Sequence, residues 1–227
     1  MPAGLRLILA VLVAAMVSSG SAVGDCTVPT PVTPVVTIAA PPVVYDTSMN
    51  RAAIKQREQQ VNRRGHSEAD IVLGTTETEI QPAATVKIEA KSDGKGGFCA
   101  TVVALKTVIA WKLVVHVASE LKAGSCMYNV VMTHEQGHVD IAQGLMGMAT
   151  DLITRAMSSI ARKSATAATP EDAYKKLQRA GATALNAAMT KLNAEMDHRQ
   201  AAHDTPEEYA KGKQACGLVE YYHALGR

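Results

Sequence analysis

The sequence changes from a strand-like to a helical pattern at residues 128–145, which read YNVVMTHEQGHVDIAQGL. Within and beyond this stretch, one face of a helix is marked at spacings of four and seven by Val130, His134, Ile141, Leu145 and Ala149. This period predicts one long helix from Tyr128 to about Ala161. The segments on either side of it have different patterns, and together they define the fold.

The residues before this helix favour strands. Between about Ala69 and Ala118 the content of β-branched residues rises, and Gly, Pro and Asp residues divide the stretch. Four strands are predicted, at Ile71–Ile80, Thr85–Ala90, Phe98–Leu105 and Val108–Val117. The glycine-rich segment Asp93–Gly97 is the clearest turn between them. We therefore expect a small antiparallel or mixed sheet.

The residues after the helix favour further helices. Thr169 is a good N-cap, Pro170 suits the first helical position, and two acidic residues follow in the first turn. This second helix is predicted to end near His203, and a third helix to begin near Thr205 and include Tyr221. Strands followed by helices predict an α+β fold.

The N-terminus has the pattern of a signal peptide. Arg6 is followed by the apolar run Leu7–Val17, which is too short to cross a bilayer. Small residues at Gly20 and Ala22 then offer a cleavage site. Residues 1–22 are therefore predicted to be removed on export to the periplasm or out of the cell, with no stable membrane span left. An uncleaved membrane anchor is the alternative.

Two regions are expected in the exported chain. Residues 23–50 are rich in proline, which disfavours helices and suits an extended linker or a strand at a sheet edge. Residues 51–227 are predicted to form one domain, which begins with a short surface helix at Arg51–Arg64.

Four cysteines remain after cleavage, at Cys26, Cys99, Cys126 and Cys216. An even number in an oxidising compartment predicts two disulfide bonds. We expect Cys99 to pair with Cys126, joining a strand to the start of the next helix, and Cys26 to pair with Cys216, joining the two ends. A zinc site built from cysteines is the less favoured alternative, because no pair has CxxC spacing.

Composition excludes one class of partner and restricts the core. The formal net charge is only +2 and no run of Lys and Arg occurs, so we expect no nucleic-acid binding. Apolar residues make up 47% of the chain but aromatic ones only 4%. The core must therefore consist mainly of aliphatic residues and methionine, which favours packed helices.

The central helix contains an HExxH motif formed by His134, Glu135 and His138. Residues four apart lie on one face of a helix, one turn from each other, so both imidazoles can bind one Zn²⁺ ion. Glu135 would project beside the metal and accept a proton from a metal-activated water. A pair of surface histidines without a metal is the alternative.

A third protein ligand is needed, and the motif does not name it. The metzincin pattern would require Gly at Ile141 and His at Gly144, which excludes that subclass. On the second helix, His203 lies in line with the apolar stripe Leu185–Met196, and Glu195 lies near it. His203 is the favoured ligand, and Glu195, the gluzincin solution, is the alternative. His203 could instead cap the helix C-terminus.

The segment Gly124–Ile141 resembles a family of secreted bacterial zinc-dependent proteases, and the similarity runs from about Val72 to the C-terminus. Only its HExxH motif is specific. The resemblance implies a zincin-like fold, with a small sheet, an active-site helix and a helical C-terminal subdomain across a cleft. The family pattern also has an aspartate followed by a His-Gly pair. Asp197 and His203–Asp204 stand in similar positions here, without the glycine.

The prediction is a zinc-dependent peptidase in which Glu135 is the general base for a metal-activated water. A peptide or protein substrate would pair with an edge strand, as in such enzymes, here Val108–Val117. Two alternatives stay open: a non-enzymatic cell-envelope protein with a structural zinc site, and a zinc hydrolase of a non-protein envelope substrate. A fourth protein ligand would favour the structural site.

Overall fold

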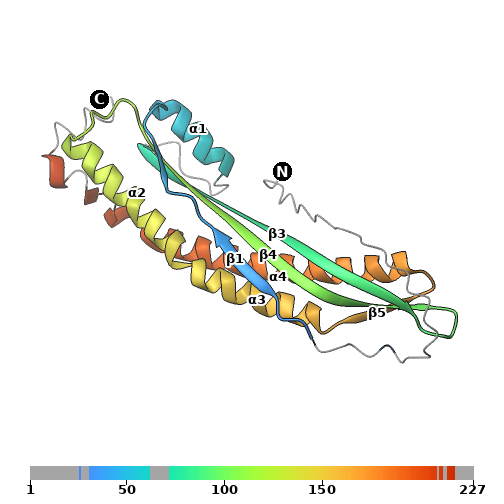
Figure 1. Cartoon of the computed structure of the whole chain (residues 1–227). Helices are drawn as coiled ribbons and strands as arrows, with labels where there is room; N and C mark the ends of the chain where they lie inside the picture. Colours follow the sequence, from blue (N-terminus) through green and yellow to red (C-terminus); the bar gives the residue numbers. More distant parts are fainter. Residues whose placement is uncertain (1–25, 27–30, 62–71, 209, 212–213, 218–227) are drawn as a thin grey trace.

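A computed structural model describes residues 26, 31–61, 72–208, 210–211 and 214–217. Its elements follow one another as β1 (Val35–Ala39), β2 (Val44–Asp46), α1 (Arg51–Val61), β3 (Gly74–Ser92), β4 (Phe98–Val117), α2 (Cys126–Gly144), α3 (Met146–Ala161), β5 (Ser164–Ala167) and α4 (Pro170–His203). Two long strands run along an elongated molecule (Figure 1). The predicted signal peptide and Tyr221 lie outside the described residues.

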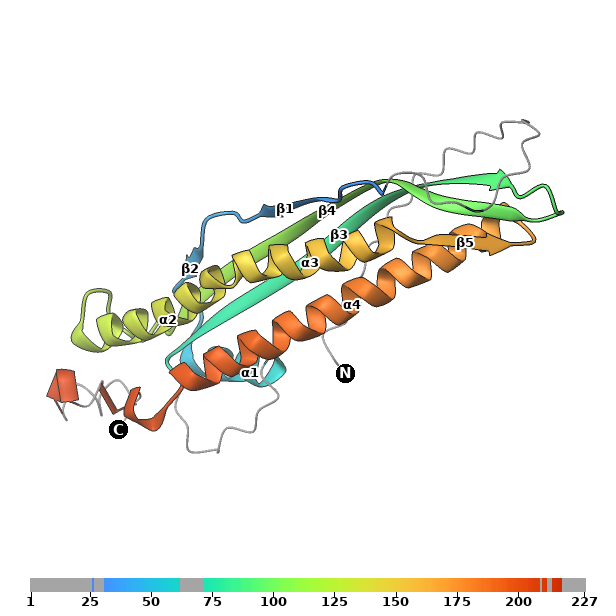
Figure 2. The same cartoon turned by 90° about the horizontal axis from the view of Figure 1, so that it is seen from below.

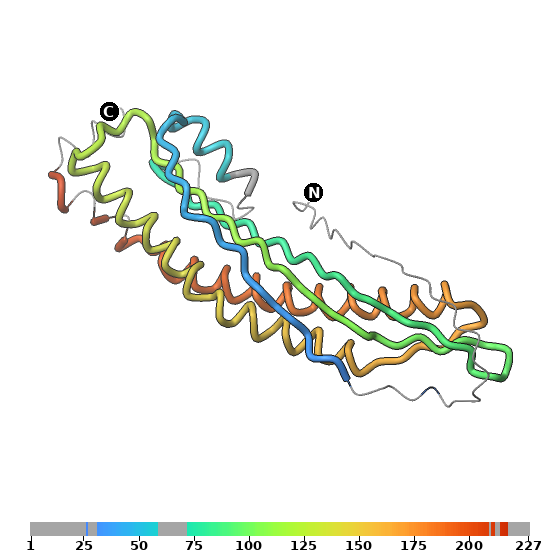
Figure 3. Tube along the Cα trace, viewed as in Figure 1, coloured from blue at the N-terminus to red at the C-terminus, as the bar shows by residue number. Residues whose placement is uncertain are grey.

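β4 is the central strand of the sheet. β3 pairs with it antiparallel along nearly its whole length. On the other side, β5, β1 and β2 pair with successive segments of β4, β5 antiparallel and the other two parallel. β1 and β2 belong to the proline-rich N-terminal segment, which runs beside β4 (Figure 3). The sheet is mixed, and the α+β class is confirmed.

The four predicted strands form only two. Pro82 does not end β3, because β3 is an edge strand among the described residues and a proline nitrogen can face away from the partner there. The predicted turn is confirmed: Gly94 and Gly96 have φ values of 71° and 89°. The carboxylate of Asp93 accepts hydrogen bonds from the backbone N–H groups of Lys95 and Gly97, both at 2.8 Å.

The prediction that Val108–Val117 is an edge strand is wrong. This part of β4 has β3 on one side, and most of its residues pair on the other side with β1 or β2. The proline-rich segment supplies those two strands, and it covers an edge that would otherwise be open.

The long helix predicted from Tyr128 to Ala161 is two helices, α2 and α3, which follow one another nearly in line (Figure 2). They meet at Leu145, whose N–H bonds to the carbonyl oxygen of Ala142 at 3.2 Å in a tighter turn. Gly144 stands just before this point, and glycine weakens a helix.

α4 agrees with its prediction. It begins after Thr169, whose hydroxyl oxygen accepts the backbone N–H of Asp172 at 3.2 Å, and it ends at His203. Of the predicted third helix, the described helical residues are 206–208, 210–211 and 214–217.

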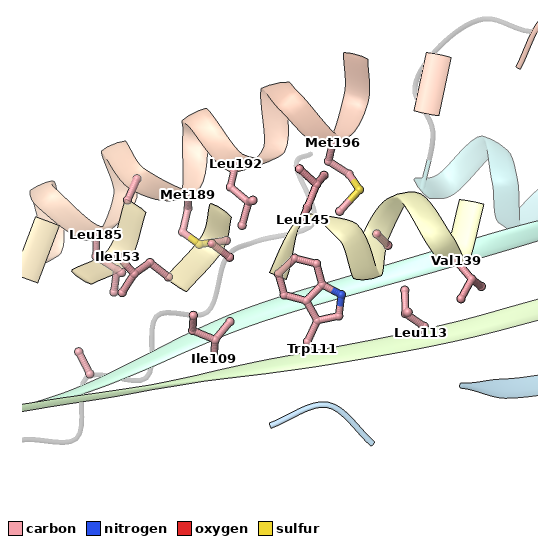
Figure 4. Close-up of a cluster of buried hydrophobic side chains, with 14 of the residues drawn as sticks. Ile109, Trp111, Leu113, Val139, Leu145, Ile153, Leu185, Met189, Leu192 and Met196 are labelled. Carbon is pink, nitrogen blue, oxygen red and sulfur yellow. The ribbon is translucent and has the colours of Figure 1, made fainter. Parts of the chain in front are cut away.

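The core lies between the sheet and the helices α2, α3 and α4. Alternate residues of β4, from Ile109 to Val117, point toward these helices and are buried. They meet the predicted apolar stripe of α4, whose buried residues are Leu185, Ala188, Met189, Leu192 and Met196. Figure 4 shows Trp111 of β4 pointing at Leu145 and Met196.

Two disulfide bonds form, as predicted, but the predicted pairing is wrong. Cys26 bonds to Cys99 and Cys126 bonds to Cys216, with Cα–Cα distances of 5.6 and 5.5 Å. Cys99 lies near the start of β4, a strand of 20 residues, and Cys126 follows its end. A strand of this length separates its ends by roughly 60 Å, so these two cysteines cannot meet.

α1 packs on the opposite face of the sheet, so that the strands lie between α1 and α2 (Figure 1). Its residue Ile54 is fully buried. Among the described residues, no helix combines the length and the apolar character that a membrane span requires.

Candidate metal centre

The start of α2 is fixed by a cap and a covalent bond. The hydroxyl oxygen of Ser125 accepts the backbone N–H of Tyr128 at 3.2 Å. Cys126, the first helical residue, is bonded to Cys216. The disulfide therefore holds the segment that follows α4 against the helix that carries the HExxH motif.

His134 and His138 lie on one face of α2, as their spacing predicts. Their ring centroids are 4.8 Å apart, and their Nε2 atoms are 3.2 Å apart. Two ligand atoms of a tetrahedral zinc ion with bonds of about 2.0 Å are separated by about 3.3 Å. The histidine pair fits one metal ion without rearrangement.

Gln200 of α4 fixes the orientation of His138. The Nδ1 atom of His138 donates to the amide oxygen of Gln200, while the amide nitrogen of Gln200 donates to the carbonyl oxygen of His138 at 3.3 Å. In a metal-bound histidine, the ring nitrogen that donates a hydrogen bond to the protein leaves the other nitrogen to bind the metal. Gln200 thus directs Nε2 of His138 toward His134.

His203, the last residue of α4, reaches the same place. Its ring stacks on that of His134 with centroids 4.7 Å apart, and it lies 4.8 Å from that of His138. Each of the three histidines offers a ligand atom within 4.8 Å of the others, so the three could hold a metal ion. The Nε2 atom of His203 lies 3.0 Å from the carbonyl oxygen of His134, to which it donates.

Gly137, inside the HExxH motif, makes room for His203. A Cβ atom at this position would lie 2.4 Å from Nε2 of His203. The absence of a side chain at Gly137 therefore lets the imidazole of α4 approach the backbone of α2.

Asp204 adds a carboxylate to the cluster. Its Oδ1 atom lies 3.2 Å from Nε2 of His134 and 3.0 Å from Nε2 of His138. Burial alone would raise the pKa of Asp204, but hydrogen bonds from both histidines hold it well below its usual range. For His138 burial acts in the opposite direction and lowers the pKa, because the charged form of histidine is the cation. The contacts with Asp204 and Glu135 outweigh burial and raise the pKa overall.

Glu135 is 3% exposed and packs under β3. The hydroxyl of Thr76 donates to Oε2 of Glu135 at 2.7 Å. Gly74 permits this close approach, because a Cβ atom there would lie 2.7 Å from Oε1 of Glu135. Burial raises the pKa of the Glu135 carboxyl, although His138 and the Thr76 hydroxyl oppose the change.

Glu195 does not join the cluster. Its carboxylate pairs with the guanidinium of Arg199 at 2.7 Å on the surface of α4. Asp197 is exposed on the same helix. The structure therefore brings His203, and not Glu195, to the histidine pair.

Sequence patterns did not indicate Gly74, Thr76 or Gln200, and they placed Asp204 only by family resemblance. Thr76 could be found from its inward position in an alternating strand, once it is known that α2 packs against β3. Gln200 lies one turn after Met196, so it falls on the α4 face that packs inward. The other two become visible only in three dimensions.

A second cluster, in which carboxylates surround the single histidine His116, lies on the opposite face of the sheet. His116 is 5% exposed, with Nδ1 3.1 Å from Asp46 and Nε2 3.5 Å from Glu77. Glu77 also pairs with Arg57 of α1. The cluster lines a pocket of about 690 Å³, to which Lys112 also contributes.

Comparison of the chain with models of protein families, with curated proteins and with solved structures finds no match. The geometry of the histidine cluster therefore carries the functional argument by itself.

Proposed function

We propose that this protein is an exported zinc-dependent peptidase with a zincin-like arrangement. The observation that carries the proposal is the convergence of His134, His138 and His203 beside the buried carboxylate of Glu135. Catalytic zinc sites have three protein ligands and one open position, and this cluster offers His134, His138 and a third ligand at the end of α4. Two disulfide bonds support an oxidising compartment, in line with export.

The residues of the cluster suit this chemistry. Zinc bound here would polarise a scissile carbonyl and lower the pKa of a water molecule. Glu135 accepts the proton of that water and passes it to the amine that leaves. Thr76 holds Oε2 of Glu135 in place, so that the carboxylate needs no rotation before it accepts the proton.

We also propose that a peptide substrate adds to the edge of β3. In the part of the chain that the structure describes, β3 pairs with β4 on one side only. Its residue Thr76 contacts Glu135, so this edge lies next to the cluster. Edge strands bind extended peptides through backbone hydrogen bonds.

A structural metal site is the second candidate, and the position of Asp204 favours it. If His134, His138, His203 and Asp204 all bound one ion, four protein ligands would close the site to water. Such a protein would bind zinc and hydrolyse nothing.

Metal analysis combined with a peptide-library cleavage assay tests the proposal. We expect about one zinc ion per chain, cleavage that a chelator abolishes, and recovery when zinc is returned. Zinc binding without cleavage of any peptide would contradict the peptidase and leave the structural site or a non-protein substrate.

A further inference from the structure

The Oδ1 atom of Asp204 and the Nε2 atoms of His134 and His138 form a nearly equilateral triangle. Its sides are 3.2, 3.2 and 3.0 Å. Ligand atoms around a tetrahedral zinc ion are separated by about 3.3 Å, because zinc bonds to imidazole nitrogen and carboxylate oxygen are about 2.0–2.2 Å long. These three atoms stand almost at the separations that coordination requires.

His203 is engaged in a different contact. Its Nε2 atom donates to the carbonyl oxygen of His134, and its ring lies against the backbone at Gly137. The ring stacks nearly parallel on that of His134, at an interplanar angle of 16°. These contacts fix the last residue of α4 on α2, and the next residue in the chain is Asp204.

We propose that Asp204 is the third protein ligand of the metal, and that His203 is a positioning residue that sets Asp204 in place. The proposal rests on the proposed function for the presence of the metal. Two histidines and one aspartate leave the fourth position of a tetrahedral ion open. With this ligand set one position on the metal stays open to water, as a hydrolytic centre requires. In the closed alternative, four protein ligands occupy every position.

Cysteine substitution with cobalt as the probe reads coordination directly. A thiolate that binds Co²⁺ gives an intense near-ultraviolet charge-transfer band, because sulfur is a soft, polarisable ligand. The full-length oxidised protein is used, in three variants: Asp204→Cys, His203→Cys and the exposed control Asp197→Cys. In a separate sample without cobalt, alkylation followed by peptide mapping shows that the free thiol is the introduced cysteine and that it has not exchanged with a native disulfide.

We expect the charge-transfer band in Asp204→Cys and in neither of the other two variants. A band in His203→Cys, alone or together with Asp204→Cys, would overturn the proposal, because His203 would then occupy a ligand position. No band in Asp204→Cys with a folded protein would also overturn it.

Zinc titration of variants without a new thiol gives an independent measurement. Asp204→Ala is expected to weaken zinc binding more than about 1,000-fold, and His203→Ala about 10-fold, the usual effect of losing a residue that orients a ligand. The isosteric variant Asp204→Asn, compared with Asp197→Asn, covers the case in which Asp204→Ala does not fold. Equal losses in the Asp204 and His203 variants, or retention in the Asp204 variants, would refute the assignment.

The two proposals fail in different ways. If zinc-loaded wild-type protein cleaves no peptide while Asp204→Cys shows the band, the peptidase is wrong and the ligand assignment stands. If the wild-type protein binds neither zinc nor cobalt, both are wrong.

Discussion

The two faces of the sheet carry two histidine–carboxylate clusters with opposite characters. On one face, His116 has a carboxylate at each ring nitrogen, 3.1 Å from Asp46 and 3.5 Å from Glu77. On the other face, His134 and His138 direct Nε2 atoms at each other and at Asp204. The distances are alike, so a short contact between histidine and carboxylate does not define a metal site. Only the face with α2 brings several ring nitrogens together in a group that could hold a metal ion, among the described residues.

Neighbouring residues of β3 serve the two clusters. Thr76 points toward α2 and holds Glu135, while Glu77 points away and pairs with Arg57 and His116. Alternation along a strand places successive side chains on opposite faces. The same short segment therefore supports the candidate metal centre on one side and an ion-pair network on the other.

The largest expected difference between the faces concerns hydrolysis. Replacing Glu135 with Gln should lower peptide cleavage by about 10²–10⁴-fold, because the amide cannot accept a proton. Zinc content should stay near one per chain, since Glu135 does not bind the metal. Activity and metal content are measured on the same preparation.

Glu77→Gln is the matched control, with the same chemical change on the other face of the sheet. We expect its cleavage rate to stay within about threefold of the wild-type rate, because the contacts of Glu77 with His116 and Arg57 lie on the face of the sheet opposite Glu135. An equal loss in the two variants would mean that the faces are functionally coupled and that Glu135 has no special role.

A smaller effect is expected from Gly137→Ala. The added methyl group would displace His203 from the backbone of α2, and zinc binding should weaken about 10-fold, as in His203→Ala. Gly147→Ala on α3 is the control, since a Cβ atom there would meet nothing within 4 Å. It should leave zinc affinity unchanged and stabilise the helix by about 1 kcal/mol. Equal zinc affinities in the two variants would show that His203 need not touch α2.

The smallest effect on the metal centre is expected from His116→Gln. Zinc affinity should change less than about twofold, while the free energy of unfolding should fall by about 1–3 kcal/mol as the buried contacts with Asp46 and Glu77 are lost. Zinc titration and urea unfolding measure the two quantities. Loss of zinc in this variant would mean that the second cluster also contributes to metal binding.

Local patterns predicted the elements that hold the centre. The HExxH spacing predicted that His134 and His138 lie on one face of a helix, and the Thr169–Pro170 pair predicted where α4 begins. The apolar stripe of α4 placed His203 near the histidine pair, because a helix keeps its register over many turns. These inferences depend on spacing within one helix, which the sequence contains in full.

Contacts between distant segments could not be predicted in this way. The disulfide pairing failed because the length of β4 was underestimated when two strands were predicted in its place. Val108–Val117 was predicted to be an edge because proline-rich residues gave no sign that they pair with it. Gly74 shows the same limit, since its role depends on how closely α2 approaches β3.

The disulfide between Cys126 and Cys216 has a consequence for the unfolded chain. Along the backbone, His134 and His203 are 69 residues apart, but the path through the disulfide is only roughly 20 residues long. Closing the shorter loop costs about 1 kcal/mol less in chain entropy. The oxidised chain therefore keeps the end of α4, with His203 and Asp204, at a higher effective concentration near His134 before it folds. A zinc ion that His134 captures then finds its next ligand within a shorter search.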